Sequence, residues 1–405
     1  MNDAEFIELS EWITATGLAG GSETAMLTEF CSRAVAIGLP LAGALVILDT
    51  LDPVYEGHAL RWERDKGDAR LNDYGRTNEG EPAENWRRSP IYHLLESGES
   101  LKYWPMTDEN VAAFPNLATF RTEGMTGFLC IINRFAAEGT IGEMDCIYSV
   151  WTTGRPGGFD ADDIEAMRRL VPFLALALKC ASFGRIATTL AETYLGRDAG
   201  RMVMQGRIAR GVADRIDAVL WFSDLSGFTR ITDTADPEHV IPLLNDYAEA
   251  VISAVHGREG DVLKLIGDGV LAIFRADDRG RACDLAIAAA LDAKRSIIAL
   301  NQRRESAGLA TTSLYLGLHV GEVFFGNIGS TKRLDFTVIG PAVNEVSRIA
   351  AMCRSVDQPL LVSAAFAASL GDARERLVSV GRYALRGVGS PQELFTLDPA
   401  HRKHG

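Results

Sequence analysis

Several features that mark other protein classes are missing from this chain of 405 residues. It has no CxxC pair and no cysteine–histidine spacing typical of a metal site, which argues against a zinc-binding or disulfide scaffold. Basic residues are outnumbered, with 41 Lys and Arg against 54 Asp and Glu, which argues against a large nucleic-acid-binding surface. We expect the six scattered cysteines to be reduced core residues: Cys31, Cys130, Cys146, Cys180, Cys283 and Cys353.

Long apolar runs are also missing. No uninterrupted stretch reaches the roughly 20 residues that cross a bilayer, and VPFLALAL (171–178) is among the longest. The start, MNDAEFIELSEW, is acidic and amphipathic, unlike a secretory signal. We therefore expect a cytoplasmic protein without a membrane span. The composition is that of an ordinary globular protein, and the length predicts two or three compact units.

The first part of the chain predicts a mixed α/β domain. Residues 5–14 have helical spacing, and residues 66–92 are polar with Gly and Pro, which predicts a long loop covering a pocket. Segments rich in β-branched and aromatic residues predict strands at 41–50, 59–65, 127–135 and 144–153.

A long helix capped by Asp160 is predicted to close this domain, which we place at residues 1–182. Leu174, Leu178 and Ala181 lie at spacings that suit either a seam between two subunits or the core face of the helix. Residues 183–211 keep helical spacing although they contain Gly184, Gly196 and Gly200 among their glycines, and we interpret them as a helical connector.

Residues 212–398 alternate between strand and helix patterns, which predicts an α+β domain with helices packed on a mostly antiparallel sheet. The expected elements are a strand at 217–224, a helix at 237–256, a hairpin at 261–274, a helix at 280–304, a strand pair at 313–329 and a helix at 342–353.

Two acidic residues stand out because each follows a predicted strand. Asp224 ends the apolar run of LWFSDLSGFTR, and Asp268 lies in LKLIGDGVLAIF. Alone, Asp224 could cap a short helix, and Asp268 could be part of an Asp-Gly hairpin turn. Together, on neighbouring strands, they would repel unless a cation lay between them. Magnesium suits such a pair because it binds few carboxylates and leaves room for substrate phosphates.

Three motifs in this order resemble those of class III nucleotidyl cyclases: FSDLSGFT, EGDVLKLIGDGVLAIF and RLDFTVIGPAVNEVSRIA. The resemblance implies a ferredoxin-like catalytic domain that converts ATP or GTP to a 3',5'-cyclic monophosphate and pyrophosphate. It implies that Asp224, Asp268 and the carbonyl of Leu225 hold two Mg²⁺ or Mn²⁺ ions, and that Gly227 and Phe228 lie against the substrate.

The resemblance also assigns base recognition to Lys264 and Thr337. An ammonium can donate to adenine N1, and guanylyl cyclases usually have Glu and Cys at these positions, so ATP is favoured. The Thr337 hydroxyl both donates and accepts, and it therefore discriminates less than the Asp of some relatives.

Further positions follow from the third motif. Asn344 would orient the ribose, and Arg348, four residues later on the same helical face, would neutralise charge on the α-phosphoryl group. Arg386 would contact the triphosphate. Pro341 replaces the Asp of many bacterial relatives, and we expect altered local contacts without loss of activity.

The catalytic site is expected to need two chains. We expect Lys264 and Asp268 to lie on the same strand, about 13 Å apart and too far for direct contact. The resemblance implies that the family resolves this by building each site across a dimer interface. We therefore expect a homodimer. Residues 1–182 loosely resemble a GAF-like sensor domain, which implies that a small molecule or partner regulates activity. A guanylate cyclase and a non-catalytic nucleotide-binding scaffold remain as alternatives.

Overall fold

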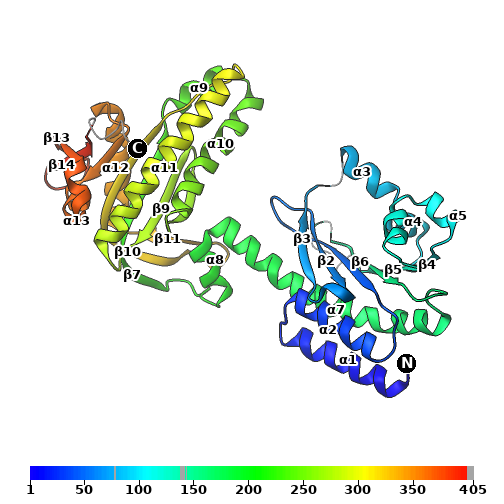
Figure 1. Cartoon of the computed structure of the whole chain (residues 1–405). Helices are drawn as coiled ribbons and strands as arrows, with labels where there is room; N and C mark the ends of the chain where they lie inside the picture. The colour runs from blue at the N-terminus through cyan, green and yellow to red at the C-terminus, as the bar shows by residue number, and fades with distance from the viewer. Residues whose placement is uncertain (77–78, 137–141, 143, 399–405) are drawn as a thin grey trace. The chain divides into compact units, whose positions relative to one another are not determined.

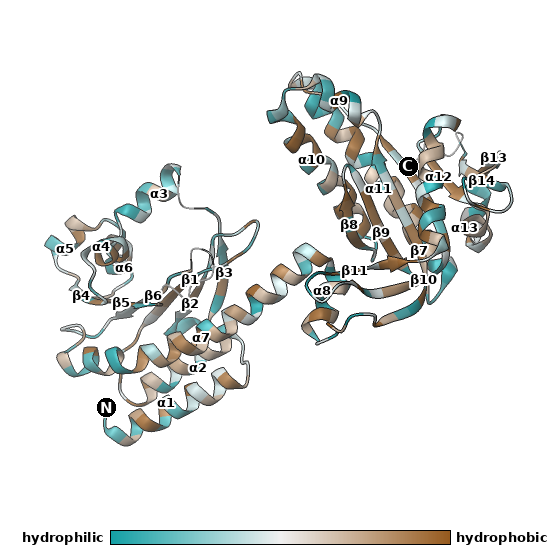
Figure 2. Cartoon of the chain, turned by 180° about the vertical axis from the view of Figure 1, so that it is seen from behind, coloured by the Kyte–Doolittle hydropathy of each residue, from teal (hydrophilic) through white to brown (hydrophobic). Residues whose placement is uncertain are grey.

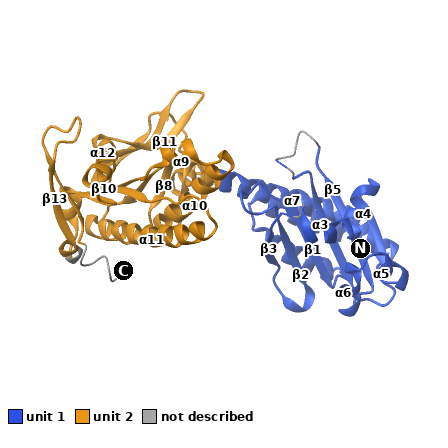
Figure 3. Cartoon of the chain, turned by 90° about the horizontal axis from the view of Figure 1, so that it is seen from above, with its two compact units in different colours: residues 1–190 blue, residues 191–405 orange. Residues whose placement is uncertain are grey.

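The computed structural model describes residues 1–76, 79–136, 142 and 144–398, and it separates the chain into two compact units, Met1–Leu190 and Ala191–Gly405 (Figure 3). The boundary falls inside the segment that we predicted as the connector. Each unit has its own β-sheet and its own apolar core (Figure 1). The α+β class expected from the sequence is confirmed.

Unit 1 is built on a six-stranded antiparallel sheet in the order β3-β2-β1-β6-β5-β4. Its strands are β1 (Gly43–Asp49), β2 (Gly57–Glu63), β3 (Arg70–Tyr74), β4 (Leu101–Pro105), β5 (Gly127–Arg134) and β6 (Cys146–Thr153). Helices α1 (Asp3–Leu18), α2 (Glu23–Ala36) and α7 (Ala161–Leu195) contribute to a core on one face. The other face is covered by α4 (Pro90–Ser97), α5 (Asp108–Ala113) and α6 (Asn116–Thr122).

The expectation of a long loop over residues 66–92 is wrong. The segment contains β3, α3 (Gly80–Arg87) and the start of α4, while residues 77–78 lie outside the described part. β3 is an edge strand with mostly exposed side chains, and α3 buries only Ala83. Elements that bury so little apolar surface lack the hydrophobic periodicity on which the prediction depended.

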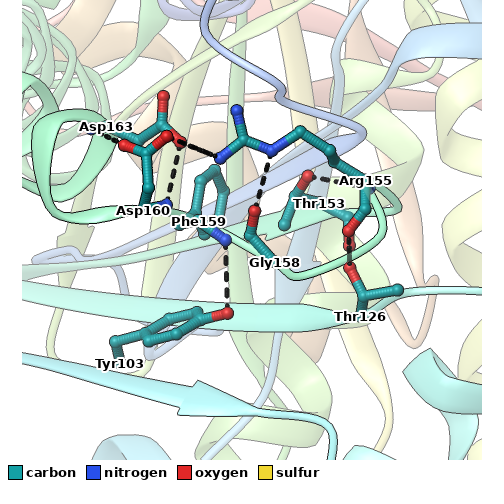
Figure 4. A network of polar contacts seen from close by, with 8 residues as sticks. All are labelled: Tyr103, Thr126, Thr153, Arg155, Gly158, Phe159, Asp160 and Asp163. Atoms are coloured by element: carbon teal, nitrogen blue, oxygen red, sulfur yellow. Dashed lines mark hydrogen bonds and ion pairs between the residues drawn. The ribbon is translucent and has the colours of Figure 1, made fainter.

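Helix α7 begins as predicted, since the Asp160 carboxylate accepts a hydrogen bond from the Asp163 N–H at 2.9 Å. Figure 4 shows how the preceding loop is fixed: Arg155 donates to the Gly158 carbonyl at 2.9 Å and ion-pairs with Asp160 and Asp163. Leu174 and Leu178 are buried in the core of unit 1. The core interpretation of their spacing is therefore confirmed.

Among the described residues, α7 is long and apolar enough to cross a membrane, by length and composition only. It contains no uninterrupted apolar run of that length, because charged residues interrupt the segment. In the structure 44% of its most apolar stretch is buried. Since buried core helices pass the same test, one such helix is weak support for a membrane span.

Unit 2 has an eight-stranded sheet in the order β13-β14-β12-β10-β7-β9-β8, with β11 paired to β10. The strands are β7 (Ala213–Leu225), β8 (Asp261–Ile266), β9 (Gly269–Arg275), β10 (Leu314–Gly329), β11 (Leu334–Ile339), β12 (Leu360–Ser363), β13 (Leu377–Tyr383) and β14 (Gln392–Leu397). Figure 2 shows the hydrophobic character of β7, β8 and β9.

The strand pair expected at 313–329 is a single strand. β10 pairs with β7 in one continuous antiparallel register from Leu314 to Gly326. Gly321, in the middle of this segment, lies opposite Ala218 within the ladder, where a side chain would come 2.9 Å from the Ala342 Cβ. This glycine therefore serves close helix packing and not a change of direction.

Helices cover both faces of this sheet. The larger core includes residues of α10 (Pro237–His256) and α11 (Arg279–Ser306), and the core on the opposite face includes residues of α8 (Arg197–Met204) and α12 (Pro341–Val356). Two short helices complete the unit, α9 (Phe228–Thr234) and α13 (Ala364–Ser369). Five of the six cysteines are buried as expected, whereas Cys180 is exposed.

Candidate active site

Asp224 lies near the end of β7 and faces away from the larger core. Trp221 and Leu225 are buried in that core, so the alternation of the strand directs Asp224 to the face that α12 covers. The buried Ser223 hydroxyl accepts hydrogen bonds from the Trp221 Nε1–H at 3.0 Å and the Tyr247 hydroxyl at 3.3 Å. These contacts fix the strand end that carries Asp224.

Asp268 lies in the turn between β8 and β9, and not on the strand with Lys264 as we expected. Ile266 pairs with Gly269, so the two turn residues are Gly267, with a φ of 63°, and Asp268. Glycine supplies the positive φ that a tight hairpin turn needs at its first central position. β9 pairs with β7, with Val270 opposite Ser223, and this register brings the turn to the end of β7.

The two carboxyl groups meet in the structure. Burial raises the pKa of Asp224 to about 6, with further contributions from a hydrogen bond to Asp268 and from its charge, while the Leu225 N–H at 3.0 Å acts in the opposite direction. Asp224 does not cap α9, whose N-terminal residue Gly227 receives no side-chain cap. The helix-cap alternative for Asp224 is therefore not what the structure shows.

This acid pair fits a divalent cation. Two partly buried carboxyl groups in contact repel each other when both are ionised, and a cation between them would relieve that repulsion. Among the described residues no group of three or more His, Cys, Asp and Glu side chains converges. A site with two carboxylates, completed by a main-chain carbonyl and water, is the kind that Mg²⁺ prefers over a full protein cage.

Gly227 and Phe228 follow the acid pair at the start of α9. Gly227 has a φ of 73°, and a Cβ there would meet nothing within 4 Å. Its glycine is therefore explained by the left-handed backbone and not by crowding. Phe228 is half-buried and packs against the larger core, which anchors the turn between β7 and α9.

Lys264 and Thr337 are connected through a residue that sequence reasoning missed. Lys264 ion-pairs with Asp335 on β11, and Thr337 lies two residues further along the same strand, so the two β11 side chains point to one side. β8 carries a register shift between Val262 and Lys264 that leaves Leu263 buried in the core under α12. The signal in the sequence that could have identified this residue is the position of Asp335, two residues before Thr337.

Asn344 and Arg348 project from α12. Helix and sheet approach closely because Gly317 of β10 lies under the helix, where a Cβ would come 2.7 Å from the Ala350 nitrogen. Asn344 is exposed, Arg348 is half-buried, and neither side chain has a hydrogen bond or ion pair with another described residue. Both are thus available to a ligand, and Pro341 occupies the first turn of α12 as expected.

The segment that carries Arg386 approaches Arg348 at the neighbouring residue Gly387. A Cβ built on Gly387, whose φ is 71°, would lie 3.3 Å from the Arg348 Nη2. Arg386 itself is exposed. The structure therefore brings the segment that carries Arg386 to Arg348, a proximity that the sequence separation of 38 residues does not reveal.

The candidate residues form three groups. These are the acid pair of Asp224 and Asp268, the group of Lys264, Asp335 and Thr337, and the α12 group of Asn344 and Arg348. The hydrogen bonds and ion pairs of the described residues join no member of one group to a member of another.

Most of unit 2 is similar to a known protein family. Residues 212–398 match the model of the adenylate and guanylate cyclase catalytic domain. An adenylate cyclase of Anabaena cylindrica is 31% identical over 212 residues, which cover 50% of this chain and 41% of that protein. Adenylate cyclase 1 of Rhizobium meliloti is 28% identical over 171 residues, 42% of this chain and 26% of that protein. The match thus spans less than half the length of these relatives.

Among solved structures, the guanylyl cyclase Cya2 is 27% identical, with a TM-score of 0.41, and covers 46% of this chain and 93% of its own. The adenylyl cyclase CyaB from P. aeruginosa is 22% identical, with a TM-score of 0.43 and coverages of 48% and 100%. The family model and the curated relatives together support an adenylate and guanylate cyclase catalytic domain in residues 212–398 of this chain.

Proposed function

We propose that the protein is an adenylate cyclase that converts ATP to 3',5'-cyclic AMP and pyrophosphate. The observation that carries the proposal is the contact between Asp224 and Asp268, which places two carboxyl groups together at the end of β7. When bound there, Mg²⁺ or Mn²⁺ would lower the pKa of the ribose 3'-hydroxyl that attacks the α-phosphorus. Asp224, Asp268 and the Leu225 carbonyl would hold the ions.

The other candidate residues would bind and orient the substrate. Arg348, without a described ion-pair partner, would neutralise charge on the α-phosphoryl group, because its planar guanidinium remains charged and makes two parallel hydrogen bonds. Asn344, one helical turn earlier, would orient the ribose. Arg386 would contact the triphosphate, and the backbone at Gly227 and Phe228 would approach the phosphates.

ATP is the proposed substrate because of Lys264 and Thr337. The Lys264 ammonium donates hydrogen bonds only, which suits adenine N1 and not the N1–H of guanine. In the structure this ammonium ion-pairs with Asp335, which lies on the same strand as Thr337 and two residues before it. GTP is the second candidate, since the Thr337 hydroxyl can serve either base.

We further propose a homodimer with active sites at the interface. Exposed apolar side chains lie close in sequence to the acid pair and to Thr337: Leu265 at 58% and Ile266 at 50% exposed on β8, and Ile339 at 48% on β11. Phe324, opposite Ile339, is 51% exposed. Apolar side chains exposed together favour a protein interface, and a second copy would supply the group that each acid pair lacks.

Unit 1 would regulate this activity in the cytoplasm by binding a small molecule or partner, with α7 as the connecting element. The full-length protein should be incubated with Mn²⁺ and either ATP or GTP, and the product identified by mass spectrometry. Cyclic AMP formation supports the proposal, and cyclic GMP alone would indicate a guanylate cyclase. If neither nucleotide gives a product, the non-catalytic nucleotide-binding scaffold is the remaining alternative.

A further inference from the structure

A cavity of about 180 Å³ lies in unit 2 between α11 and the strands β10, β12 and β14. Its wall is mainly apolar and includes Leu291, Ile297, Leu314, Leu316, Pro359 and Leu360. Leu314, Leu316 and Leu360 are buried, whereas Ile298 on the α11 side is 49% exposed. The cavity is therefore built into the core and open along α11, and it contains none of the proposed catalytic residues.

One charged residue lines this cavity in the described part of the chain. Lys294 is half-buried on α11, and it has no hydrogen bond or ion pair with another described residue. Ile297, Ile298 and Asn301 lie three, four and seven residues later and share its helical face. An aliphatic lysine stem along an apolar wall leaves the ammonium at the edge, where it can pair with an anion.

The wall of the cavity adjoins the acid pair. Leu314 lies opposite Leu225, and Tyr315 lies opposite Asp224 in the β10–β7 ladder. The Ser226 N–H donates to the Ser313 carbonyl at 2.8 Å. The strand that lines the cavity on one side therefore pairs directly with the segment that would hold the metal ions.

The residues just before β10 are fixed to α11 by Asn301. Its Nδ2 donates to the Thr312 carbonyl at 2.5 Å, and its Oδ1 accepts from the Thr312 N–H at 3.2 Å. Thr312 is buried and lines the cavity. A molecule that separates α11 from β10 would therefore strain these contacts and move residues 312–316.

We propose that this cavity binds an amphiphilic anion with an unbranched apolar tail, of the class of medium-chain carboxylates, and that its occupancy alters the position of Asp224 and Leu225. The volume sets the tail length: if each methylene takes about the 30 Å³ of a water molecule in the liquid, roughly six carbons fill it. Octanoate is close to this size. An effect on turnover depends on the proposed cyclase function, whereas binding does not.

Binding is tested by titration calorimetry of the full-length protein with octanoate, octanol and octylammonium. We expect octanoate to bind at least roughly tenfold more tightly than octanol, because an ion pair formed beside an apolar wall adds to the burial of the tail. Each methylene from hexanoate to octanoate should tighten binding roughly fourfold. Equal affinities for octanoate and octanol would overturn the assignment of Lys294.

Two variants locate the site. Lys294→Gln should remove the preference for octanoate over octanol, and Ile298→Glu, at a half-exposed position that tolerates substitution, should weaken octanoate by placing an acid beside the lysine. Arg303→Gln, on the same helix but outside the cavity lining, is the matched control and should leave binding unchanged. Unchanged octanoate binding in both cavity variants contradicts the proposed site.

Coupling is tested by hydrogen exchange of the Ser226 amide without nucleotide or metal. Octanoate should change its exchange rate at least about threefold in the wild type and not in Lys294→Gln. An unchanged rate at saturating octanoate would overturn the coupling. If octanoate binds and alters Ser226 while no cyclic nucleotide forms under any condition, the cavity assignment stands and the cyclase proposal fails.

Discussion

At the scale of single residues, Asp224 combines an unfavourable environment with a place at the end of a rigid strand. It is partly buried, it contacts another acid, and its pKa is raised to about 6 for these reasons. Buried like charges cost folding free energy, and such arrangements concentrate at functional sites. The stability and the activity of the protein should therefore respond in opposite directions to the loss of this charge.

The change Asp224→Asn tests this opposition. Cyclic AMP formation should fall at least roughly 100-fold, because the charge that holds the cations is lost. In metal-free buffer the melting temperature should rise, since the repulsion with Asp268 is removed. The exposed Asp233 of α9 provides the control, and Asp233→Asn should change neither quantity. A fully active Asp224→Asn enzyme contradicts the metal assignment.

Base selection is the second prediction at this scale. The double change of Lys264 to Glu and Thr337 to Cys should lower kcat/KM for ATP at least roughly tenfold and raise it for GTP, because the carboxylate accepts from the guanine N1–H. Initial rates with each nucleotide measure the ratio. A ratio that stays at the wild-type value would show that these two positions do not read the base.

At the scale of elements, the start of β8 is joined to helix α8. Asp261 is only 5% exposed and accepts hydrogen bonds from the backbone N–H groups of Arg197 at 3.0 Å and Asp198 at 3.3 Å. Burial, followed by the charge of Asp198, raises its pKa to about 6, while the N–H donors act in the opposite direction. The effect of burial on the pKa of Asp261 is therefore larger than the opposite effect of the N–H groups at the start of α8.

The consequence is a dependence of stability on pH. Between its ordinary pKa and about 6, Asp261 is protonated in the folded protein and ionised in the unfolded chain, so stability decreases as pH rises through this window. From pH 4.5 to 7 the loss from this group is on the order of 2 kcal/mol, at about 1.4 kcal/mol per pKa unit.

Asp261→Asn should reduce this dependence, and the raised pKa of Asp224 accounts for part of the slope that remains. Hydrogen exchange of the buried amides of β9, corrected for intrinsic pH effects, gives the free energy of opening at each pH. Asp277→Asn, at an exposed position two residues after the end of β9, should keep the wild-type slope. Equal slopes in all three proteins would show that Asp261 is not the responsible group.

Elements with strong local signals were predictable from the sequence. Helix α10 has the predicted bounds, because Asp236 and Pro237 begin it and apolar spacing continues to His256. The acid pair was also predictable, since each Asp follows a strand. Asp335 and Gly387 were missed because their roles depend on contacts between distant segments, with Lys264 and Arg348 respectively. Local periodicity carries no information about such contacts.

At the scale of the whole molecule, a shared site makes two inactive variants complementary. If each site takes its acid pair from one chain and Arg348 from the other, a mixed dimer of Asp224→Asn and Arg348→Ala contains one intact site. In a 1:1 mixture about half of the dimers are mixed, so roughly a quarter of the wild-type activity should return. Activity of the mixture after subunit exchange measures this fraction.

Native mass spectrometry supplies the control by showing that mixed dimers have formed. Activity that remains absent in a sample with mixed dimers contradicts sites shared between chains. Turnover by wild-type protein that stays monomeric at assay concentration contradicts the homodimer itself.

The register shift in β8 gives two adjacent residues different environments. Leu263 supplies the buried contact, and the adjacent Lys264, the residue proposed to recognise the base, has a side chain that is 28% exposed. Exchanging the lysine therefore leaves the folded core intact. In evolutionary terms, a lineage with this strand could exchange Lys264 without losing the folded core, and the ion-pair partner Asp335 would be the residue that has to change with it.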